Sequence, residues 1–481
     1  MFVFASKANT LPWLRHLQCI YNLLIYRHCS YNYLQQLQQM KGVLKMARTK
    51  EELKAAALKA IDENREKIMA IGDSIFSEPE LGYKEFKTAE KVKKLFEELN
   101  YSYTDGVAIT GIIAPLKGKE SRMKLAIMGE LDAVVSPLHP NADPKTGAAH
   151  CCGHNCMIAG LAGVAYALKD TGIMEELSGD IVLMAVPAEE YVEIGYRKQL
   201  KDEGKVHFLG GKQEFVKLGV MDDIDMMIMQ HTSGTENGIT GTCGGASNGF
   251  LGQLIHYTGK EAHAGGSPHN GINALNAAVV GLTAVNAQRE TFKDDDHIRV
   301  HPIITKGGDL VNVVPADVRL ENYVRGANVE AILDAAKKVT RAFEAGGMAV
   351  GAQTEVINLP GYLPFITNDG LMDIAYENLV DLMGKDHVIK TDAAGGGSTD
   401  AGDISHLMPT LHANIAGAEG AFHSDKYRLV DREMAYIIAA KALIMTAIDL
   451  LADGAEAGLK IKEDFVPAMT KEQFLKDWGN L

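Results

Sequence analysis

Short hydrophobic runs separated by helical patterns are the feature of this sequence that most restricts its fold. The run Ile181–Val186 is continuously apolar, and Lys124–Glu130 and Met226–Gln230 have a similar character. Continuous apolar strands are typical of sheets that are covered on both faces. A helix rich in small apolar residues is predicted at about 155–169, between two of these strands. The pattern therefore predicts an α/β fold with a central, mostly parallel sheet.

A different pattern begins near Thr242. It predicts two helices, at Gly271–Gln288 and Asn328–Ala345, among four strands, at Phe250–Thr258, Arg299–Thr305, Asp317–Val324 and Gln353–Leu359. This β-α-β-β-α-β order is typical of a ferredoxin-like α+β unit with an antiparallel sheet. After Pro364 the helix–strand alternation resumes. We expect a catalytic domain made of residues 46–242 and 358–455, an inserted domain at 243–357 and a C-terminal tail at 456–481.

Basic residues are concentrated at the start of an otherwise acidic chain. The first fifty residues contain seven basic residues and no acid, whereas the remainder has 41 basic against 62 acidic residues, a net −21. A total charge of −14 argues against a general nucleic-acid binder, which needs a basic face. The apolar stretch Cys19–Tyr26 is far shorter than the roughly 20 residues that cross a bilayer. We expect neither nucleic acid nor membrane as a partner.

Residues 1–45 have the positive charge of a transit peptide but few serines and threonines. Met46 opens a charged helical pattern like that of an ordinary protein start, so we interpret residues 1–45 as an extension outside the fold, with targeting as the alternative. Of six cysteines, three lie between Cys151 and Cys156 beside histidines. This is not the spacing of a secreted disulfide framework, and it favours a cytoplasmic protein with reduced thiols and a metal site.

Acidic motifs follow two of the predicted strands. GELDAV, residues 129–134, ends one strand, and PAEE, residues 187–190, ends another. In α/β sheets, ligands bind at the carboxyl ends of the strands. Adjacent carboxylates at a buried strand end are costly unless they are used, so one can bind metal while its neighbour acts as a general base. The alternatives are a turn-starting Asp132 and a solvated acidic pair.

Histidines and cysteines occupy further positions around the same sheet. HCCGHNC, residues 150–156, directly precedes a helix, His231 follows a strand, and His423 lies in the loop before the last long helix. Thiolate and imidazole are good ligands for zinc-like cations, although a single histidine is more often structural. A purely structural zinc at Cys151, Cys152, His154 and Cys156 is the alternative. We predict a two-ion site with Glu189 as base and five ligands: Cys152, His154, Glu190, His231 and His423.

Together these motifs resemble the dinuclear metallopeptidases and amidohydrolases, a family that includes aminoacylases, glutamate carboxypeptidases and hippurate hydrolases. The resemblance covers about residues 50–455. The p-aminobenzoyl-glutamate hydrolase and dipeptidase-like branch is the most similar. Besides GELDAV and PAEE, the motifs that carry the resemblance are PELGYKE (79–85), CCGHN (151–155), GGK (210–212), DIDMMIMQH (223–231), GKEAHAGGSPHNGINAL (259–275), GSTDAGDIS (397–405) and the loop with His423.

The resemblance implies a metal-dependent amidohydrolase or peptidase. Its substrate would be a small amino-acid conjugate, such as p-aminobenzoyl-glutamate, an N-acyl amino acid or a dipeptide, cleaved by a metal-activated water. It implies two divalent ions, Zn or Mn, held by the five ligands above, with Glu189 as base and Asp132 behind a metal ligand. In the inserted domain, His263 would reach the substrate or the oxyanion, often from the other subunit of a homodimer. Asn273 and Arg325 match positions used for substrate carboxylate or lid contacts.

Two departures from the family pattern concern specificity. Many relatives have Asp and a second His where this chain has Asn155 and Met157, which weakens any transfer of their substrate preference. The segment 191–209 is longer than expected and is predicted to lie beside the site. A catalytically weak, metal-stabilised subunit that binds amino-acid conjugates or supports a hetero-oligomer is the alternative function.

Overall fold

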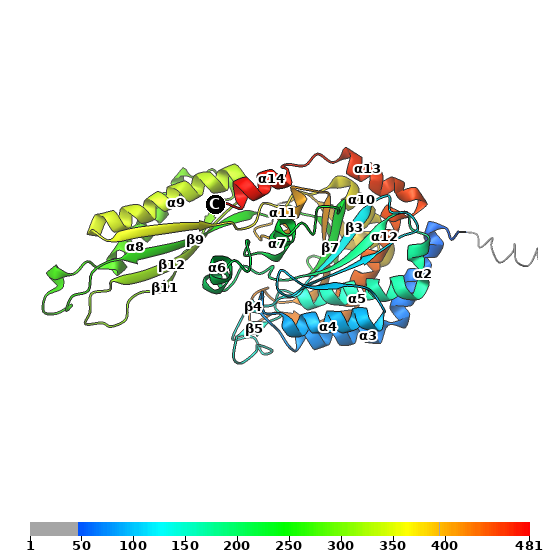
Figure 1. Ribbon diagram of the computed structural model, residues 1–481, viewed down its shortest axis with the longest axis horizontal. Helices are drawn as coiled ribbons and strands as arrows, with labels where there is room; N and C mark the ends of the chain where they lie inside the picture. Colours follow the sequence, from blue (N-terminus) through cyan, green and yellow to red (C-terminus); the bar gives the residue numbers. More distant parts are fainter. Residues whose placement is uncertain (1–46, 394) are drawn as a thin grey trace, which may run out of the picture. The chain divides into compact units, whose positions relative to one another are not determined.

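A computed structural model describes residues 47–393 and 395–481 of the chain. The chain divides into two units, Met1–Thr49 and Lys50–Leu481, and the fold described below is that of the second unit (Figure 1). The predicted extension, residues 1–45, lies outside the described residues.

The second unit is built on a mixed sheet whose centre is parallel. The strand order is β1-β2-β6-β3-β7-β15-β8-β14, with β16 beside β15. The four central strands run parallel to one another, and β6 is buried along its whole length. Antiparallel strands occur only toward the edges of the described sheet. The bounds are β1 (Thr104–Val107), β2 (Gly111–Leu116), β3 (Lys124–Glu130), β6 (Asp180–Val186), β7 (Met226–Gly234), β8 (Gly241–Gly244), β14 (Val388–Thr391), β15 (Thr410–Glu419) and β16 (Arg428–Leu429).

Helices cover the two faces of this sheet, as the continuous apolar strands require. The helix α5 (His154–Thr171) is the centre of one layer and is buried on every side up to Leu168. Its small residues permit close packing, since a side chain at Gly163 would come within 2.4 Å of Ala440 Cβ. The same layer contains α2 (Lys50–Glu63), α3 (Arg65–Phe76), α4 (Phe86–Glu98), α10 (Asp369–Met383) and α12 (Ala439–Leu451). Smaller helices pack into the second core, namely α6 (Ile194–Asp202), α7 (Gly211–Lys217) and α11 (Ala401–Ser405).

One helical stretch among the described residues, Glu433–Leu451, is apolar and long enough to cross a membrane by length and composition alone. Within the protein, 78% of its apolar window is buried, chiefly against α5. Packing in the core therefore accounts for its hydrophobic composition.

The inserted domain forms its own antiparallel sheet, in the order β10-β12-β9-β13 with β11 beside β12. Two helices, α8 (Ala274–Ala287) and α9 (Val329–Val350), pack on each other and on this sheet (Figure 1). The predicted β-α-β-β-α-β order is present, and the expected strand at Arg299–Thr305 is divided into two. The strands are β9 (Gly249–Thr258), β10 (Arg299–Val300), β11 (Ile303–Lys306), β12 (Asp317–Gly326) and β13 (Gln353–Leu359).

Residues 456–481, expected to be a tail, are folded against the rest of the unit. They include α13 (Glu456–Asp464) and α14 (Lys471–Gln473). The Phe474 ring stacks on Phe208 with centroids 5.4 Å apart, and the buried Trp478 donates a hydrogen bond to the carbonyl of Gly361 at 3.0 Å. Burial of two aromatic side chains holds this segment in place.

Candidate metal centre

The motif residues meet at one edge of the central sheet, because each follows a parallel strand or begins the helix that packs behind it. Strand β3 leads to Asp132, β6 leads to Glu189 and Glu190, and β7 contains His231. The turn before α5 places His154 beside them. Gly153 in that turn has φ 91°, and an added Cβ would lie 3.0 Å from the Tyr427 hydroxyl. The tight turn therefore depends on glycine.

The five predicted ligands lie together in two groups that share one residue. Potential ligand atoms of Cys152, His154 and His231 lie within 4.8 Å of one another, as do those of Cys152, Glu190 and His423. The Cys152 sulfur is 3.4 Å from His231 Nε2, and His423 Nε2 is 3.0 Å from Glu190 Oε1. Because Cys152 belongs to both groups, this arrangement fits two neighbouring ions.

The donor atoms fit a divalent metal in type and in orientation. His154 Nδ1 lies 2.9 Å from the backbone oxygen of Asp132 and 3.3 Å from its carboxylate, which leaves Nε2 directed toward the site. His154 Nε2 and Glu190 Oε1 are buried and make no hydrogen bond of standard geometry, although an acidic or basic neighbour lies 3.0 Å from each. Thiolate, imidazole and carboxylate ligands with unused lone pairs suit zinc-like cations.

Electrostatics gives the same indication. Burial, followed by the neighbouring Glu190, raises the pKa of the Cys152 thiol well above its usual value. Burial, with Glu130 and Glu190, also holds the pKa of Glu189 well above the normal range. Burial opposes ionisation of Glu190, but His423 outweighs it and lowers the pKa of this carboxyl to about 2. Without a cation the Cys152 thiol and the Glu189 carboxyl therefore keep their protons, and a bound cation would favour their ionised forms.

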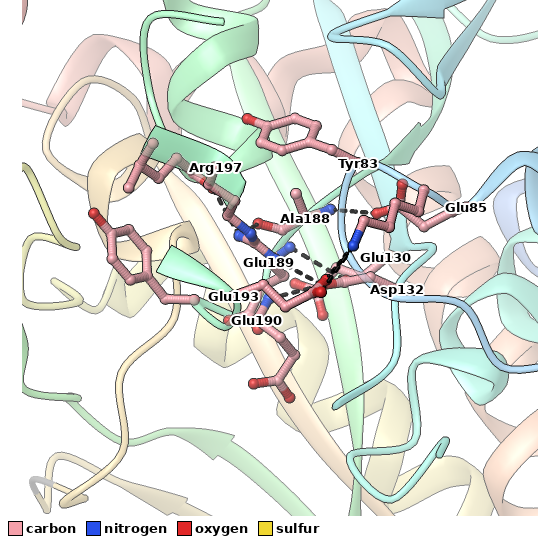
Figure 2. Close-up of polar contacts among 12 residues, drawn as sticks. Tyr83, Glu85, Glu130, Asp132, Ala188, Glu189, Glu190, Glu193 and Arg197 are labelled. Carbon is pink, nitrogen blue, oxygen red and sulfur yellow. Dashed lines mark hydrogen bonds and ion pairs between the residues drawn. The ribbon is translucent and has the colours of Figure 1, made fainter. Parts of the chain in front are cut away.

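Asp132 of the GELDAV motif contacts residues of both the PAEE and the CCGHN motifs. Its carboxylate is fully buried and accepts hydrogen bonds from the backbone N–H of Glu189 at 3.2 Å and of Glu190 at 2.9 Å (Figure 2). The same carboxylate lies beside His154 Nδ1. Asp132 therefore orients both acidic residues and one imidazole, as expected of an aspartate behind a metal ligand.

Buried charges that sequence reasoning missed lie next to these residues. Lys212 is fully buried, with Nζ 2.5 Å from Glu130 Oε1 and an ion pair to Asp400. The other oxygen of Glu130 is 3.0 Å from His154 Nε2, and a third potential ligand group consists of Glu130, His154 and Glu189. Burial opposes the charge of Lys212, but Asp400 and Glu130 raise its pKa above the ordinary value. The motifs GGK and GSTDAGD were the only signal of this network.

A cavity of about 760 Å³ opens over the ligands. Besides Cys152, Glu189 and His423, its wall includes Arg325 of the inserted domain. The Arg325 guanidinium donates a hydrogen bond to Ser398 Oγ at 2.7 Å and lies over the rings of Phe250 and Tyr323. The predicted contact residue Arg325 is thus within reach of a molecule bound at the ligands.

His263 and Asn273 are placed elsewhere within one chain. His263 is exposed, and its Nδ1 accepts hydrogen bonds from the backbone N–H groups of Gly265 and Gly266. The Asn273 side chain caps α8 by accepting from the N–H of Asn276 at 3.0 Å. Neither residue lines the cavity over the ligands.

The alternative of a structural zinc site is not favoured by the geometry. Cys151 and Cys156 are buried, and neither belongs to a potential ligand group among the described residues. The four described cysteines are all free thiols. Of the four residues of this alternative site, Cys151, Cys152, His154 and Cys156, only Cys152 lines the cavity.

Comparison with known proteins identifies a peptidase family and relatives that are named as amide-bond hydrolases. Residues 126–447 match the family described as peptidase family M20/M25/M40. The chain is 27% identical to the Xaa-Arg dipeptidase of Mus musculus over 452 residues, which covers 88% of this chain and 95% of that protein. It is also 27% identical to an N-acetylcysteine deacetylase of Bacillus subtilis, over 66% of this chain and 80% of the relative.

Solved structures show the same fold. A Bacillus subtilis protein described as a dinuclear metal-binding peptidase of the M20 family aligns with a TM-score of 0.59 at 21% identity, over 81% of this chain and 99% of that one. The aminobenzoyl-glutamate utilization protein of Klebsiella pneumoniae aligns with a TM-score of 0.62 at 19% identity, over 81% and 97% of the two chains. The predicted α/β fold with an inserted domain is confirmed.

Proposed function

This chain belongs to peptidase family M20/M25/M40, and on that premise we propose that it cleaves the amide bond of a small amino-acid conjugate at the ligands around Cys152. It is a metal-dependent hydrolase of peptide and other amide bonds. The observation that carries the proposal is the position of Glu189, which lines the cavity next to two ligand groups that share Cys152.

The ligand set proposed for two divalent ions, Zn or Mn, divides between the two groups. Cys152, His154 and His231 would hold one ion, and Cys152, Glu190 and His423 would hold the other. Bound there, such ions would bring the pKa of a water from 15.7 to about 7 and would polarise the scissile carbonyl.

Glu189 is the proposed catalytic base. It lines the cavity, and its Oε2 lies 3.9 Å from His154 Nε2, so its carboxylate faces the ligands and the substrate space together. It would accept a proton from the attacking water and deliver the proton to the leaving amine. Its backbone is fixed by the Asp132 carboxylate, which limits the cost of orienting the base.

The proposed substrate carries a free carboxylate close to the scissile amide. Arg325 provides the cation for it, since its guanidinium lies in the cavity wall with ring faces on one side. A cavity of about 760 Å³ suits a dipeptide, an N-acyl amino acid or a conjugate like p-aminobenzoyl-glutamate. These three classes are the candidates.

A homodimer through the inserted domain is the proposed assembly. Apolar side chains are exposed on this domain, at Val279 on α8, Ile303 and Ile304 on the edge strand β11, and Val311 in the following loop. Exposed apolar residues beside an unpaired strand edge are typical of an association surface. His263 pairs with Val313 next to that loop, so a second copy docked here offers His263 a route to the partner's cavity.

The free thiols support a cytoplasmic location.

A Glu189→Gln variant tests the proposal, assayed with a panel of the three substrate classes and with Zn or Mn. We expect kcat to fall about 10³-fold, because general-base catalysis contributes roughly 10²–10⁴. Metal content, measured by mass spectrometry, should stay that of the wild type. Glu203→Gln is the matched control, because this acid is on the surface and pairs with Lys205. Unchanged turnover in Glu189→Gln would remove Glu189 as base, and an inactive wild type on every substrate would favour the weak-subunit alternative.

A further inference from the structure

The residue before the two catalytic acids has an unusual backbone conformation. Ala188 has φ 57°, in the left-handed region that residues other than glycine rarely adopt. Its side chain is fully buried. Because Glu189 and Glu190 follow directly, the conformation of Ala188 sets the directions in which both carboxylates leave the chain.

Two side chains hold the peptide groups of Ala188 from either end. The Ala188 N–H donates to Glu85 Oε1 at 2.8 Å, and its carbonyl accepts from Arg197 Nη1 at 3.1 Å (Figure 2). The same Arg197 nitrogen donates to the carbonyl of Leu209 at 2.7 Å. Glu85 and Arg197 are both fully buried, so these bonds do not compete with water.

The surroundings are shaped to admit the guanidinium. A Cβ added to Gly82 would lie 2.1 Å from Arg197 Nη2 and 2.9 Å from Ala188 Cα, so this position has room only for glycine. The guanidinium lies 5.5 Å from the centroid of the Tyr83 ring and 4.0 Å from Asp132 Oδ2. Arg197 therefore contacts the residues that orient Glu189, although it does not line the cavity itself.

Arg197 is supplied by α6, within the segment 191–209 that is longer than expected. The start of this helix is tied to the body by an ion pair of 2.7 Å between Lys84 and Glu193. Lys84 also lies over the Tyr196 ring, 4.0 Å from its centroid. These contacts fix the position of the segment, and its Arg197 guanidinium is buried against the backbone of Ala188.

We propose that Arg197 is a positioning residue, which with Glu85 locks Ala188 in the left-handed conformation and so aims Glu189 at the reacting water. The proposal rests on the function proposed for Glu189. It gives the segment 191–209 a role in catalysis through the backbone of Ala188 and not through contact with substrate.

The first test compares kcat and KM of Arg197→Met, Arg197→Lys and the control Lys198→Met, whose side chain pairs with Asp202 on the surface of the same helix. Misplacing a catalytic group by about 1 Å costs on the order of 10²-fold, so Arg197→Met should lose about that much in kcat with little change in KM. Arg197→Lys keeps the charge and one donor to a carbonyl, so it should recover part of the loss. The control should match the wild type.

The second test separates positioning from a general structural role. If Arg197 acts by stabilising a strained alanine, Ala188→Gly should make it less necessary, since glycine adopts positive φ without strain. The loss caused by Arg197→Met should then fall to about tenfold in the Ala188→Gly background. Gly82→Ala, which displaces the guanidinium without removing it, should reproduce part of the loss if Arg197→Met fails to fold.

Two readouts besides activity accompany these variants. Thermal melts report folding, and the absorption of cobalt bound to the Cys152 thiolate reports the metal site. Wild-type kcat in Arg197→Met, or a loss of the same size with and without the Ala188→Gly substitution, would overturn the proposal. If Glu189→Gln were fully active, the proposed base itself would fail, whereas an inactive Glu189→Gln beside a fully active Arg197→Met would refute only the positioning role.

Discussion

The α/β body and the inserted domain differ in how they place their predicted site residues. In the body, the five predicted ligands and the proposed base come from four separate segments and lie together within one chain. Of the three site residues predicted in the inserted domain, Arg325 lines the cavity, while His263 and Asn273 do not. Strand ends of one sheet share an edge by necessity, whereas a second domain has no such constraint. Motifs therefore predict a site within a sheet more securely than a site between domains or subunits.

The largest expected effect tests whether His263 completes the site of a second copy. His263→Ala and Glu189→Gln should each lose most activity, since one oxyanion donor is worth roughly 10²–10³-fold and a general base about as much. When the two variants are refolded together, each hybrid dimer has one chain with Glu189 that receives the partner's His263. About a quarter of the sites, and of the activity, should return.

A mixture of the two variants that regains no activity would contradict a role of His263 in the site of the second copy. In that case His263 serves its own chain or has no catalytic role, and the partner subunit does not complete the site. Mixing Glu189→Gln with Cys152→Ala is the control, because both changes affect the same cavity and no hybrid dimer regains a complete site.

An intermediate effect is expected for Arg325, an inserted-domain residue that lines the cavity. Arg325→Met should raise KM about 10–100-fold for substrates with a free carboxylate, since a hydrogen bond to a charged group is worth roughly 1.5–3 kcal/mol. Substrates amidated at that carboxylate should be unaffected. Arg319→Met on the same strand is the control, because Arg319 pairs with Asp317 at the surface. Equal KM changes for acid and amide would show that Arg325 does not bind the carboxylate.

The sequence was sufficient for the fold because its strongest signals are local. The apolar runs at β3, β6 and β7 coincide closely with the predicted strands, and β9 and β13 do so in the inserted domain. The packing of residues 456–481 was not predictable, since it depends on where Phe208 and Gly361 lie in space. Periodicity describes which face of an element is apolar but not which partner covers it.

Some residues of the site could likewise be predicted from the sequence, and others could not. Residue types and their positions beside strands and helices were enough to predict that Cys152, Glu190 and His231 lie at one site, and all three line the cavity. Arg197 and Lys212 were missed because a cation in a polar stretch is normally exposed. Only the fold shows both fully buried, Lys212 against two carboxylates and Arg197 against two backbone carbonyls. Their contacts join segments that are separate in the chain, and the periodicity of a single sequence does not show such contacts.

The smallest expected effect concerns the body, at Glu85. Burial, followed by Asp132, raises the pKa of this carboxyl from 4.5 to about 7. The folded protein then holds a proton between these values that the unfolded chain has released, so the free energy of unfolding falls as pH rises from about 5 to 7. Glu85→Gln resembles the protonated acid and should lack this part of the decrease. Melting temperatures from pH 5 to 8 measure it, and parallel curves for both proteins would contradict it.

Cys152 is proposed to connect two ion sites, and a count of bound metal ions tests this role. The protein would be stripped with a chelator, reloaded with Zn or Mn, and analysed by mass spectrometry together with its hydrolytic activity. We expect about two exchangeable ions per chain, activity that is lost and restored with them, and reduced occupancy of both sites in Cys152→Ala. A single ion that resists the chelator, or two ions retained by Cys152→Ala, would contradict it.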